Sequence, residues 1–234
     1  MDFSTIKSIT IPEGNVTQIA VGSKVLWKSG PLPSAYQQVE WIRGKPISAS
    51  SGAYLDLGFA FDTAAVIHLN FIRHESNGQP FGAAENSGKY RCMVSQSTNT
   101  YYYIYGSTGS AYVAEHIDGL GQEVDLVYTL KKGVLKAEDL ITGKVTSTDS
   151  QNSIAAFTMT RNLYLFAQNY NTAARFAGQY SFKSFQYYDK NNTLICDLIP
   201  CYRKSDGVIG MYDIVRKIFL TNAGSGSFTK GADV

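Results

Sequence analysis

Apolar and polar residues alternate with a period of two along most of this chain, and this alternation is the strongest limit on its fold. Such a pattern puts the apolar side chains on one face of a β-strand, whereas an amphipathic helix needs a period near 3.6. Most of the alternating segments are bounded by Gly, Asn, Asp or Ser: YQQVEWI, AYLDLGF, AVIHLNFI, QPFGAA, YRCMVSQ, YYYIYG, AYVAEHI, EVDLVYTL, NLYLFAQ, QYSFKSFQYY and TLICDLI. The sequence therefore predicts an all-β protein of antiparallel strands, arranged as a sandwich, jelly roll or barrel.

The first 30 residues are set apart from the rest. STIKSITI and VTQIAVGSKVLWK alternate around the turn PEGN, which predicts a small hairpin or three-stranded unit. The Pro- and Gly-containing residues 29–35 interrupt the pattern, so we expect an N-terminal β attachment element over residues 1–30 and a main domain over residues 31–234. Isolated hairpins are marginally stable in water, so the element is expected to pack on another surface, and we favour a partner protein.

Charge and motif content exclude several function classes. The formal net charge is only +2 and the basic pairs are scattered, which disfavours a nucleic-acid partner. No apolar run approaches the roughly 20 residues of a membrane-spanning helix. The first residues have neither the basic nor the apolar region of a standard signal peptide. The three cysteines match no zinc spacing and the three histidines are far apart, so we expect no metal and no other cofactor.

The end of the chain has a pattern of closely spaced turns. DLIPCYRKSDGVIGMYDIVRKIFLTNAGSGSF, from Asp197 to Phe228, predicts a strand ended by Pro200, then two strands joined around residues 214–216 and a glycine-rich exit. Together with LPSAYQQVEWI and GAYLDLGF, it resembles the concanavalin A-like, laminin-G-like jelly rolls of phage and prophage structural proteins. The segment ITIPEGNVTQIAVGSKVLWKSG is similar to a short N-terminal module of phage tail and baseplate proteins.

The resemblance implies a concanavalin A-like jelly roll with a binding or structural role in a virion. It leaves the ligand open. Members of the family usually have YIESTGTQYIDTG where this chain has WIRGKPISASSGAYLDLG, so the loop over residues 44–51 is expected to be specialised.

One pair of carboxylates is a candidate for catalysis. Laminarinase-type glycoside hydrolases of this fold place three carboxylates on one strand as E-x-D-x-E or E-x-D-x-x-E, because alternate spacing points them at the same face. In QEVDLVYTL, Glu123 and Asp125 share a face, but Val127 and Tyr128 occupy the places of the third carboxylate. No other residue is placed to protonate a leaving sugar, so the sequence favours a protein that is not an enzyme.

A row of tyrosines is a candidate binding surface. In TNTYYYIYG, Tyr101, Tyr103 and Tyr105 alternate along one predicted strand and share a face. Aromatic rings can stack on the C–H faces of sugars, so the row is a possible glycan platform; the alternative is that the rings cap the core with their hydroxyls in water. Trp41 is expected in the core, and no D-x-D-x-D loop indicates a calcium site.

Two hypotheses follow from the sequence. In the first, the protein is a phage or prophage tail, baseplate or receptor-binding component located in the virion. Its N-terminal element attaches to other virion proteins or to further copies of the chain, and its jelly roll binds host-surface glycan. In the second, the same fold hydrolyses a bacterial surface polysaccharide.

Overall fold

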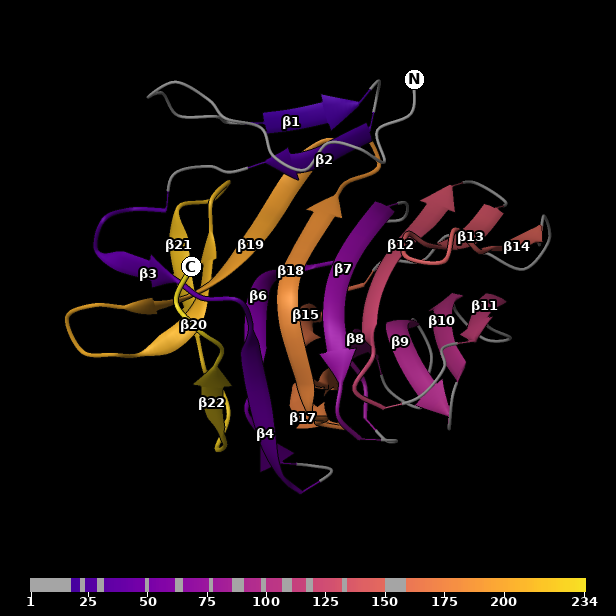
Figure 1. Cartoon of the computed structure of the whole chain (residues 1–234). Helices are drawn as coiled ribbons and strands as arrows, with labels where there is room; N and C mark the ends of the chain where they lie inside the picture. The colour runs from indigo at the N-terminus through magenta and orange to yellow at the C-terminus, as the bar shows by residue number, and fades with distance from the viewer. Residues whose placement is uncertain are drawn as a thin grey trace.

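A computed structural model describes residues 18–21, 24–28, 32–48, 51–61, 65–75, 78–85, 91–97, 100–106, 111–116, 120–131, 134–149 and 159–234 (Figure 1). Every regular element in these ranges is a β-strand, and none of their residues forms a helix able to cross a membrane. The strands β1 (Gln18–Val21) and β2 (Lys24–Lys28) form a two-stranded antiparallel sheet of their own. A hairpin is therefore present within VTQIAVGSKVLWK, whereas the predicted turn PEGN and the strand before it lie outside the described residues, and the domain boundary near residue 30 stays a prediction.

A twelve-stranded sheet forms the front of the molecule in Figure 1. Its main path runs in the order β14 (Val145–Asp149), β13 (Val134–Asp139), β12 (Glu123–Lys131), β7 (Ala65–Arg73), β18 (Tyr180–Tyr188), β19 (Leu194–Arg203), β20 (Ile209–Asp213) and β21 (Ile218–Thr221). Four further strands join this path at its sides: β3 (Tyr36–Gln38), β4 (Ile42–Ser48), β5 (Ser51–Gly52) and β22 (Ser227–Lys230).

An eight-stranded sheet lies behind it. Its path runs in the order β11 (Ala111–His116), β10 (Thr100–Gly106), β9 (Arg91–Ser97), β8 (Phe81–Ala84), β15 (Asn162–Leu165) and β6 (Leu55–Ala60). The strands β16 (Gln168–Tyr170) and β17 (Ala173–Arg175) extend it beside β8.

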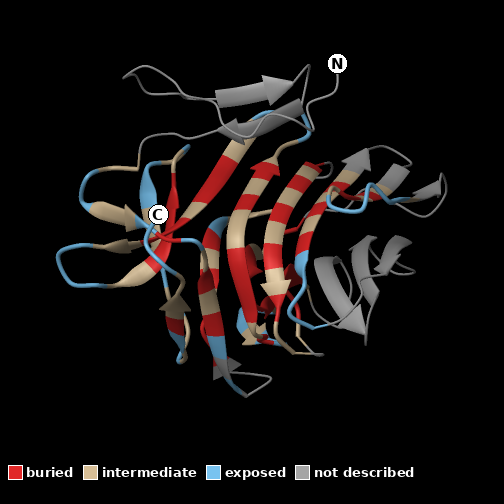
Figure 2. Ribbon diagram, in the orientation of Figure 1, coloured by how far each residue is buried: buried red, intermediate tan, exposed pale blue. Residues whose placement is uncertain are grey.

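The two sheets bury one shared core. Every second residue of β7 from Ala65 to Arg73 is buried, so one face of this strand is inside and the other faces solvent. The fully buried core side chains come from both sheets: Leu55, Leu57, Phe81, Leu163, Leu165, Ile67, Leu69, Phe71, Leu126, Phe182 and Phe185. Figure 2 shows the alternating buried residues along the central strands. Each such side chain stabilises the fold by about 1.5–3 kcal/mol relative to an exposed one.

The strand order is that of a jelly roll. The strand β7 lies in the twelve-stranded sheet, although β6 and β8, which flank it in sequence, lie in the eight-stranded sheet. The chain later returns to place β12 and β18 on either side of β7, and β15 between β8 and β6, with antiparallel pairing throughout this set. Two face-to-face sheets whose neighbouring strands come from distant sequence form an antiparallel jelly-roll sandwich. The fold class predicted from the sequence is confirmed.

The motif YDIVRK forms a buried clamp at the turn between β20 and β21. Asp213 is fully buried, and its Oδ1 accepts hydrogen bonds from the backbone N–H groups of Val215 (2.9 Å) and Arg216 (3.1 Å). Arg216 Nε donates to Asp213 Oδ2, and Arg216 Nη1 donates to the carbonyl of Leu57 in β6. The same guanidinium lies 5.0 Å from the centre of the Phe59 ring. One ion pair therefore closes the turn and ties it to the opposite sheet.

The motif TNAGSGS forms a second fixed turn. The Oδ1 atom of Asn222 accepts from the N–H groups of Tyr54 (3.2 Å) and Gly224 (2.9 Å), and its Nδ2 donates to the carbonyls of Gly224 (3.2 Å) and Gly226 (2.6 Å). A Cβ on Gly224 would lie 2.0 Å from the carbonyl oxygen of Gly52, so no larger residue fits there. The C-terminal motif thus consists mainly of residues that shape turns and fasten them to the sandwich.

Candidate functional site

A β-bulge in β18 places an extra residue on the outer face of the twelve-stranded sheet. Phe182 and Phe185 are both fully buried, although Lys183 and Ser184 stand between them. On the neighbouring strand β7, only Asn70 separates the partners of the two phenylalanines. Both intervening residues of β18 therefore lie on the solvent side. Bulges of this kind often direct a side chain towards a functional site.

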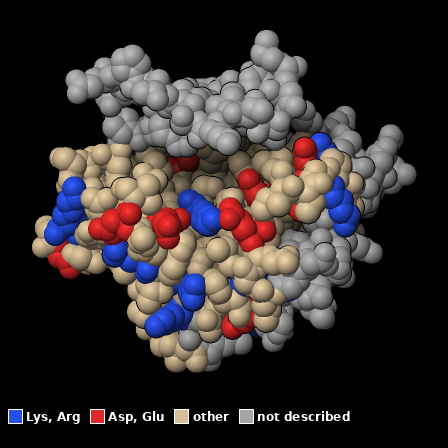
Figure 3. Space-filling view, viewed as in Figure 1, with Lys and Arg blue, Asp and Glu red and all other residues tan. Residues whose placement is uncertain are grey.

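The bulged lysine belongs to a polar network that crosses three strands. Lys183 Nζ donates a hydrogen bond to Glu123 Oε2 on β12, and Asn70 Nδ2 on β7 donates to Glu123 Oε1 at 2.8 Å. Next to them, His68 Nε2 on β7 lies 2.6 Å from Asp125 Oδ1. Figure 3 shows acidic and basic side chains side by side across the middle of this face. The outer face of the sheet is therefore polar, ordered and accessible at its centre.

The Glu123 carboxyl is held in its ionised form. Burial raises its pKa, but the hydrogen bonds from Lys183 and Asn70, together with the charge of Lys183, outweigh burial and leave the pKa of Glu123 below its usual value. A general acid for glycoside hydrolysis needs the opposite shift, because it must carry a proton near neutral pH. Glu123 is suited to accepting hydrogen bonds rather than to donating a proton.

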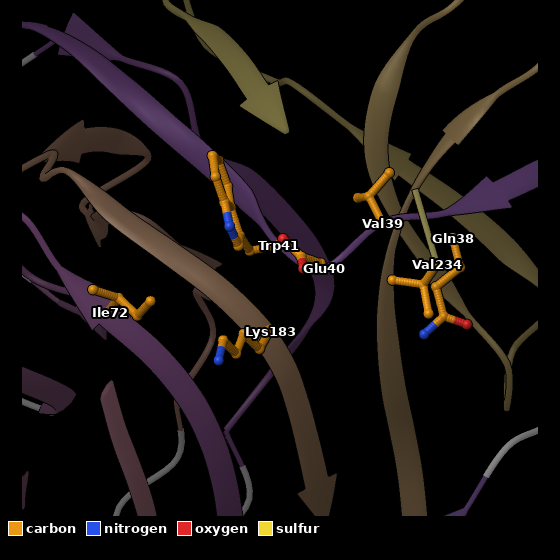
Figure 4. Close-up of a pocket in the computed structure, with 7 residues that line it drawn as sticks. All are labelled: Gln38, Val39, Glu40, Trp41, Ile72, Lys183 and Val234. Atoms are coloured by element: carbon orange, nitrogen blue, oxygen red, sulfur yellow. The ribbon is translucent and has the colours of Figure 1, made fainter. Parts of the chain in front are cut away.

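A hollow of about 400 Å³ lies at the β4 end of this network. It is lined by Gln38, Val39, Glu40, Trp41, Ile72, Lys183 and Val234 (Figure 4). In Figure 4 the indole of Trp41 and the side chains of Ile72 and Lys183 lie towards one side, with Gln38 and Val234 towards the other. The lining therefore combines one aromatic ring with an amide, an ammonium group and a carboxylate.

Backbone pairing with the C-terminal residues positions Trp41. The N–H of Gly231 donates to the carbonyl of Trp41 at 2.9 Å, and the N–H of Glu40 donates to the carbonyl of Ala232 at 3.0 Å. A Cβ on Gly231 would lie 2.8 Å from Trp41 Nε1, so the glycine backbone packs against the indole edge. The guanidinium of Arg43 lies 4.8 Å from the indole ring centre. The half-buried ring is thus supported by its neighbours.

Arg43 is held in place by a hydrogen bond to a buried serine. Its Nε donates to Ser181 Oγ at 2.9 Å, and His74 Nε2 lies 2.8 Å from the same oxygen. Burial, and then the nearby Arg43 charge, lower the pKa of His74, so its ring is uncharged near neutral pH. Because Ser181 is fully buried, this serine–histidine contact is a support for Arg43 and not an exposed nucleophile.

The predicted tyrosine row lies on a strand of the other sheet. Tyr101, Tyr103 and Tyr105 belong to β10, which pairs with β9 on one side and β11 on the other. Alternate positions in this strand place the three residues on one face. Their side chains lie outside the described part of the structure, so the glycan platform stays a prediction. The structure brings none of these strand positions next to the hollow.

The predicted carboxylate pair does share a face, as expected. Glu123 and Asp125 both project from the outer side of β12, opposite Ile72 and Asn70 of β7. The next outward position of β12 is Val127, which leaves the three-carboxylate arrangement incomplete on this strand. Among the described residues, no group of three or more His, Cys, Asp and Glu side chains is arranged to hold a metal ion.

Trp41 and Lys183 line the hollow although the sequence pattern did not mark either of them as a binding residue. The expectation that Trp41 belongs to the core is wrong, because β3 ends at Gln38 and β4 begins at Ile42. This interruption resets the alternation, so Ile42 takes the buried position and Trp41 lines the hollow. A signal for Lys183 was present in QYSFKSFQYY, where two core phenylalanines are three residues apart instead of two.

No protein-family model matches the sequence, and no curated protein matches it. Among solved structures, the chain is similar to domains LG4-5 of the mouse laminin alpha1 chain, with a TM-score of 0.47 and 9% identity over 89% of this chain and 50% of that one. It is also similar to the enzymatically active domain of tailspike protein 2 from bacteriophage CBA120, with a TM-score of 0.39 and 11% identity over 70% of this chain and 30% of that one.

A third similarity is to scytalido-glutamic peptidase, with a TM-score of 0.32 and 12% identity over 85% of this chain and 100% of that one. The chain spans half the length of the laminin LG4-5 structure and less than a third of the tailspike structure. At these levels of similarity, none of the comparisons assigns the protein to a family or gives it an activity.

Proposed function

We propose that this jelly roll is a non-catalytic carbohydrate-binding module of a phage or prophage virion, and that the hollow beside Trp41 and Lys183 receives the sugar. The observation that carries the proposal is the supported indole ring of Trp41 beside Lys183, Gln38 and Glu40. Binding sites commonly combine apolar or aromatic walls with a few placed polar groups.

The chemistry of a sugar matches this lining. A pyranose ring has apolar C–H faces and a rim of hydroxyl groups that both donate and accept hydrogen bonds. The Trp41 indole offers an apolar surface with an N–H donor at its edge. The ammonium of Lys183 donates, the Glu40 carboxylate accepts, and the Gln38 amide does both. Each type of group on the sugar therefore has a partner in the hollow.

The virion assignment rests on sequence patterns. The C-terminal turns and the N-terminal segment resemble those of phage structural and tail proteins, which supports attachment through residues 1–30 and ligand binding by the main domain. A host-surface glycan is the ligand that this context favours.

The glycoside hydrolase alternative has less support. The third carboxylate is missing from β12 next to Glu123 and Asp125. In addition, the lowered pKa of Glu123 leaves it without the proton that the leaving group requires. We therefore propose that the sugar is bound without being cleaved.

The proposal is tested by incubating the full chain with an array of bacterial surface oligosaccharides and assaying the same samples for newly formed reducing ends. We expect retention of at least one glycan class without release of reducing sugar. The variant Trp41→Ala is expected to bind about fivefold or more weakly, because a stacked ring contributes about 1–3 kcal/mol.

A matched control is Phe176→Ala, which removes another accessible aromatic ring beside β17 in the eight-stranded sheet. This variant should bind like the wild type. Equal binding by Trp41→Ala and wild type would refute the proposed site, and sugar release by the wild type would refute the non-catalytic assignment.

A further inference from the structure

We propose that the binding surface extends from the hollow across the outer face of the twelve-stranded sheet and takes a linear, uncharged oligosaccharide of about three sugar residues. The extended surface, here called the outer strip, comprises Trp41, Ile72, Lys183, Asn70, Glu123, His68 and Asp125. This inference rests on the proposed function and adds to it the length and the charge of the ligand.

The strand register makes the outer strip continuous. Arg43 of β4 pairs with Ser181 of β18, Ser181 pairs with Ile72 of β7, and Ile72 pairs with Glu123 of β12. These positions form one row perpendicular to the strands, with Trp41 and the hollow at its β4 end. Neighbouring strands are about 4.8 Å apart, so four adjacent strands span about 14 Å, which is comparable to three pyranose rings in line.

The surface of the outer strip changes in character with distance from the hollow. Trp41 and Ile72 provide apolar contact area next to Lys183, and both line the hollow. Beside them, the Lys183–Glu123–Asn70 network presents donors and acceptors. The His68–Asp125 pair follows along β7 and β12, because Asn70 pairs with Asp125 two residues from the Ile72–Glu123 pair, and His68 pairs with Val127 two residues further on. A linear glycan presents the same combination, because each ring carries C–H faces and a hydroxyl rim. Each unit of the chain therefore meets groups of matching type.

The charges of the outer strip select against an acidic glycan. Lys183, the cation closest to the middle of the strip, is already paired with Glu123. Glu123 and Asp125 of the strip and Glu40 of the adjoining hollow supply three carboxylates, whereas Lys183 of the strip and Arg43 beside Trp41 supply two permanent cations. A uronate or sialate carboxylate placed along the row would meet more negative than positive charge and would disrupt existing pairs. Neutral hydroxyl groups can instead hydrogen-bond to the paired groups without separating them.

The test is a calorimetric titration of the full chain with neutral gluco-, galacto-, manno- and N-acetylglucosamine oligomers of one to five residues, and with oligogalacturonates as acidic counterparts of the galactose series. We expect one neutral series to bind, with the dissociation constant falling at each step up to about three residues and staying level beyond that. The matching acidic oligomers should bind at least tenfold more weakly.

Two variants locate the effect. His68→Ala, at the far end of the outer strip, is expected to remove the affinity gained on going from two to three residues, about three- to tenfold, and to leave the monosaccharide affinity unchanged. Arg175→Ala, which removes a cation stacked on Tyr170 beside β17, is the control and should behave as wild type at every length.

Different results of these titrations would overturn different parts of the two proposals. Equal affinity for one and three residues overturns the outer strip but leaves the proposed sugar site at Trp41 intact. Tighter binding of the oligogalacturonates overturns the inferred neutrality of the ligand. The lack of binding by every neutral and acidic probe counts against both the strip and the proposed function.

Discussion

The C-terminal turns and the outer face of the twelve-stranded sheet differ in how their polar groups are used. The side chains of Asp213 and Asn222 accept hydrogen bonds from nearby backbone N–H groups. Asn222 also accepts one from the N–H of Tyr54, next to the edge of the opposite sheet. On the outer face, Lys183 bonds to Glu123 and His68 bonds to Asp125, and all four side chains keep part of their surface in water. The region with the recognisable motif therefore maintains the fold, while the region without a motif is the one available to a ligand.

The largest expected effect is on the turn clamp. Asp213→Ala would leave the partly buried Arg216 guanidinium without its carboxylate, which for a buried ion pair costs about 3–5 kcal/mol of the free energy of unfolding. Urea denaturation of the variant should show this loss. The control is Asp206→Ala, which breaks an exposed pair with Arg203 in the preceding turn and should lower the stability far less. Similar losses for the two variants would show that burial of Asp213 is not what makes the clamp strong.

The next prediction concerns the bulge of β18 on the outer face of the twelve-stranded sheet. Deletion of Lys183 removes the extra residue of the bulge, so that β18 and β7 pair in a regular register from Ser181 to Phe185. We expect the free energy of unfolding to change by only about 1 kcal/mol, since no core side chain is moved to the outside. Glycan binding on the array should be lost, because the network with Glu123 is lost. A deletion variant that unfolds, or that binds normally, would contradict the role assigned to the bulge.

These two regions also differ in how far the sequence predicts them. The alternation of apolar residues predicted the strands and the sandwich, because burial on one face of a strand imposes a period of two. The turns were predictable because Asp, Asn and Gly at fixed spacings satisfy local backbone groups. Both signals act over a few residues, so they are present in the sequence itself.

The hollow could not be predicted in the same way. Its lining comes from residues 38–41, 72, 183 and 234, which only the tertiary fold brings together. The break between β3 and β4 that moves Trp41 out of the core depends on pairing of residues 39–41 with the segment 231–233, a contact across most of the chain. For the tyrosine row, local alternation does predict that the three residues share one face of a strand. It does not predict whether that face binds a ligand.

A smaller effect on stability is expected from His74, which contacts the same serine oxygen as Arg43. The pKa of His74 is lowered from its ordinary value of 6.5, so the unfolded chain takes up a proton at a higher pH than the folded protein does. The stabilising contribution is therefore complete above about pH 6.5 and is lost as the pH falls through that value towards the lower folded pKa. His74→Gln should lack this loss.

The check is a pair of urea denaturation curves at about pH 7.5 and about pH 5.5 for wild type and His74→Gln. The wild type should lose more stability than the variant between the two pH values. Equal losses would show that His74 titrates alike in the folded and unfolded states.

The smallest expected effect concerns the tyrosine row. Tyr103→Ala should leave glycan affinity unchanged if the ligand binds at the hollow, because β10 belongs to the eight-stranded sheet. A loss of about 1–3 kcal/mol of binding free energy, without a loss of stability, would instead identify the row as the glycan platform. Thermal melting and array binding of the same preparation distinguish these results.

The most direct test of the account is the indole N–H region of a ¹H–¹⁵N correlation spectrum recorded during titration with the glycan selected on the array. The chain has only two tryptophans, Trp27 and Trp41, and the Trp41→Phe variant assigns the two signals. We expect the Trp41 signal to shift with the same dissociation constant as calorimetry gives, and the Trp27 signal to stay in place. Saturated binding with an unmoved Trp41 signal would contradict it.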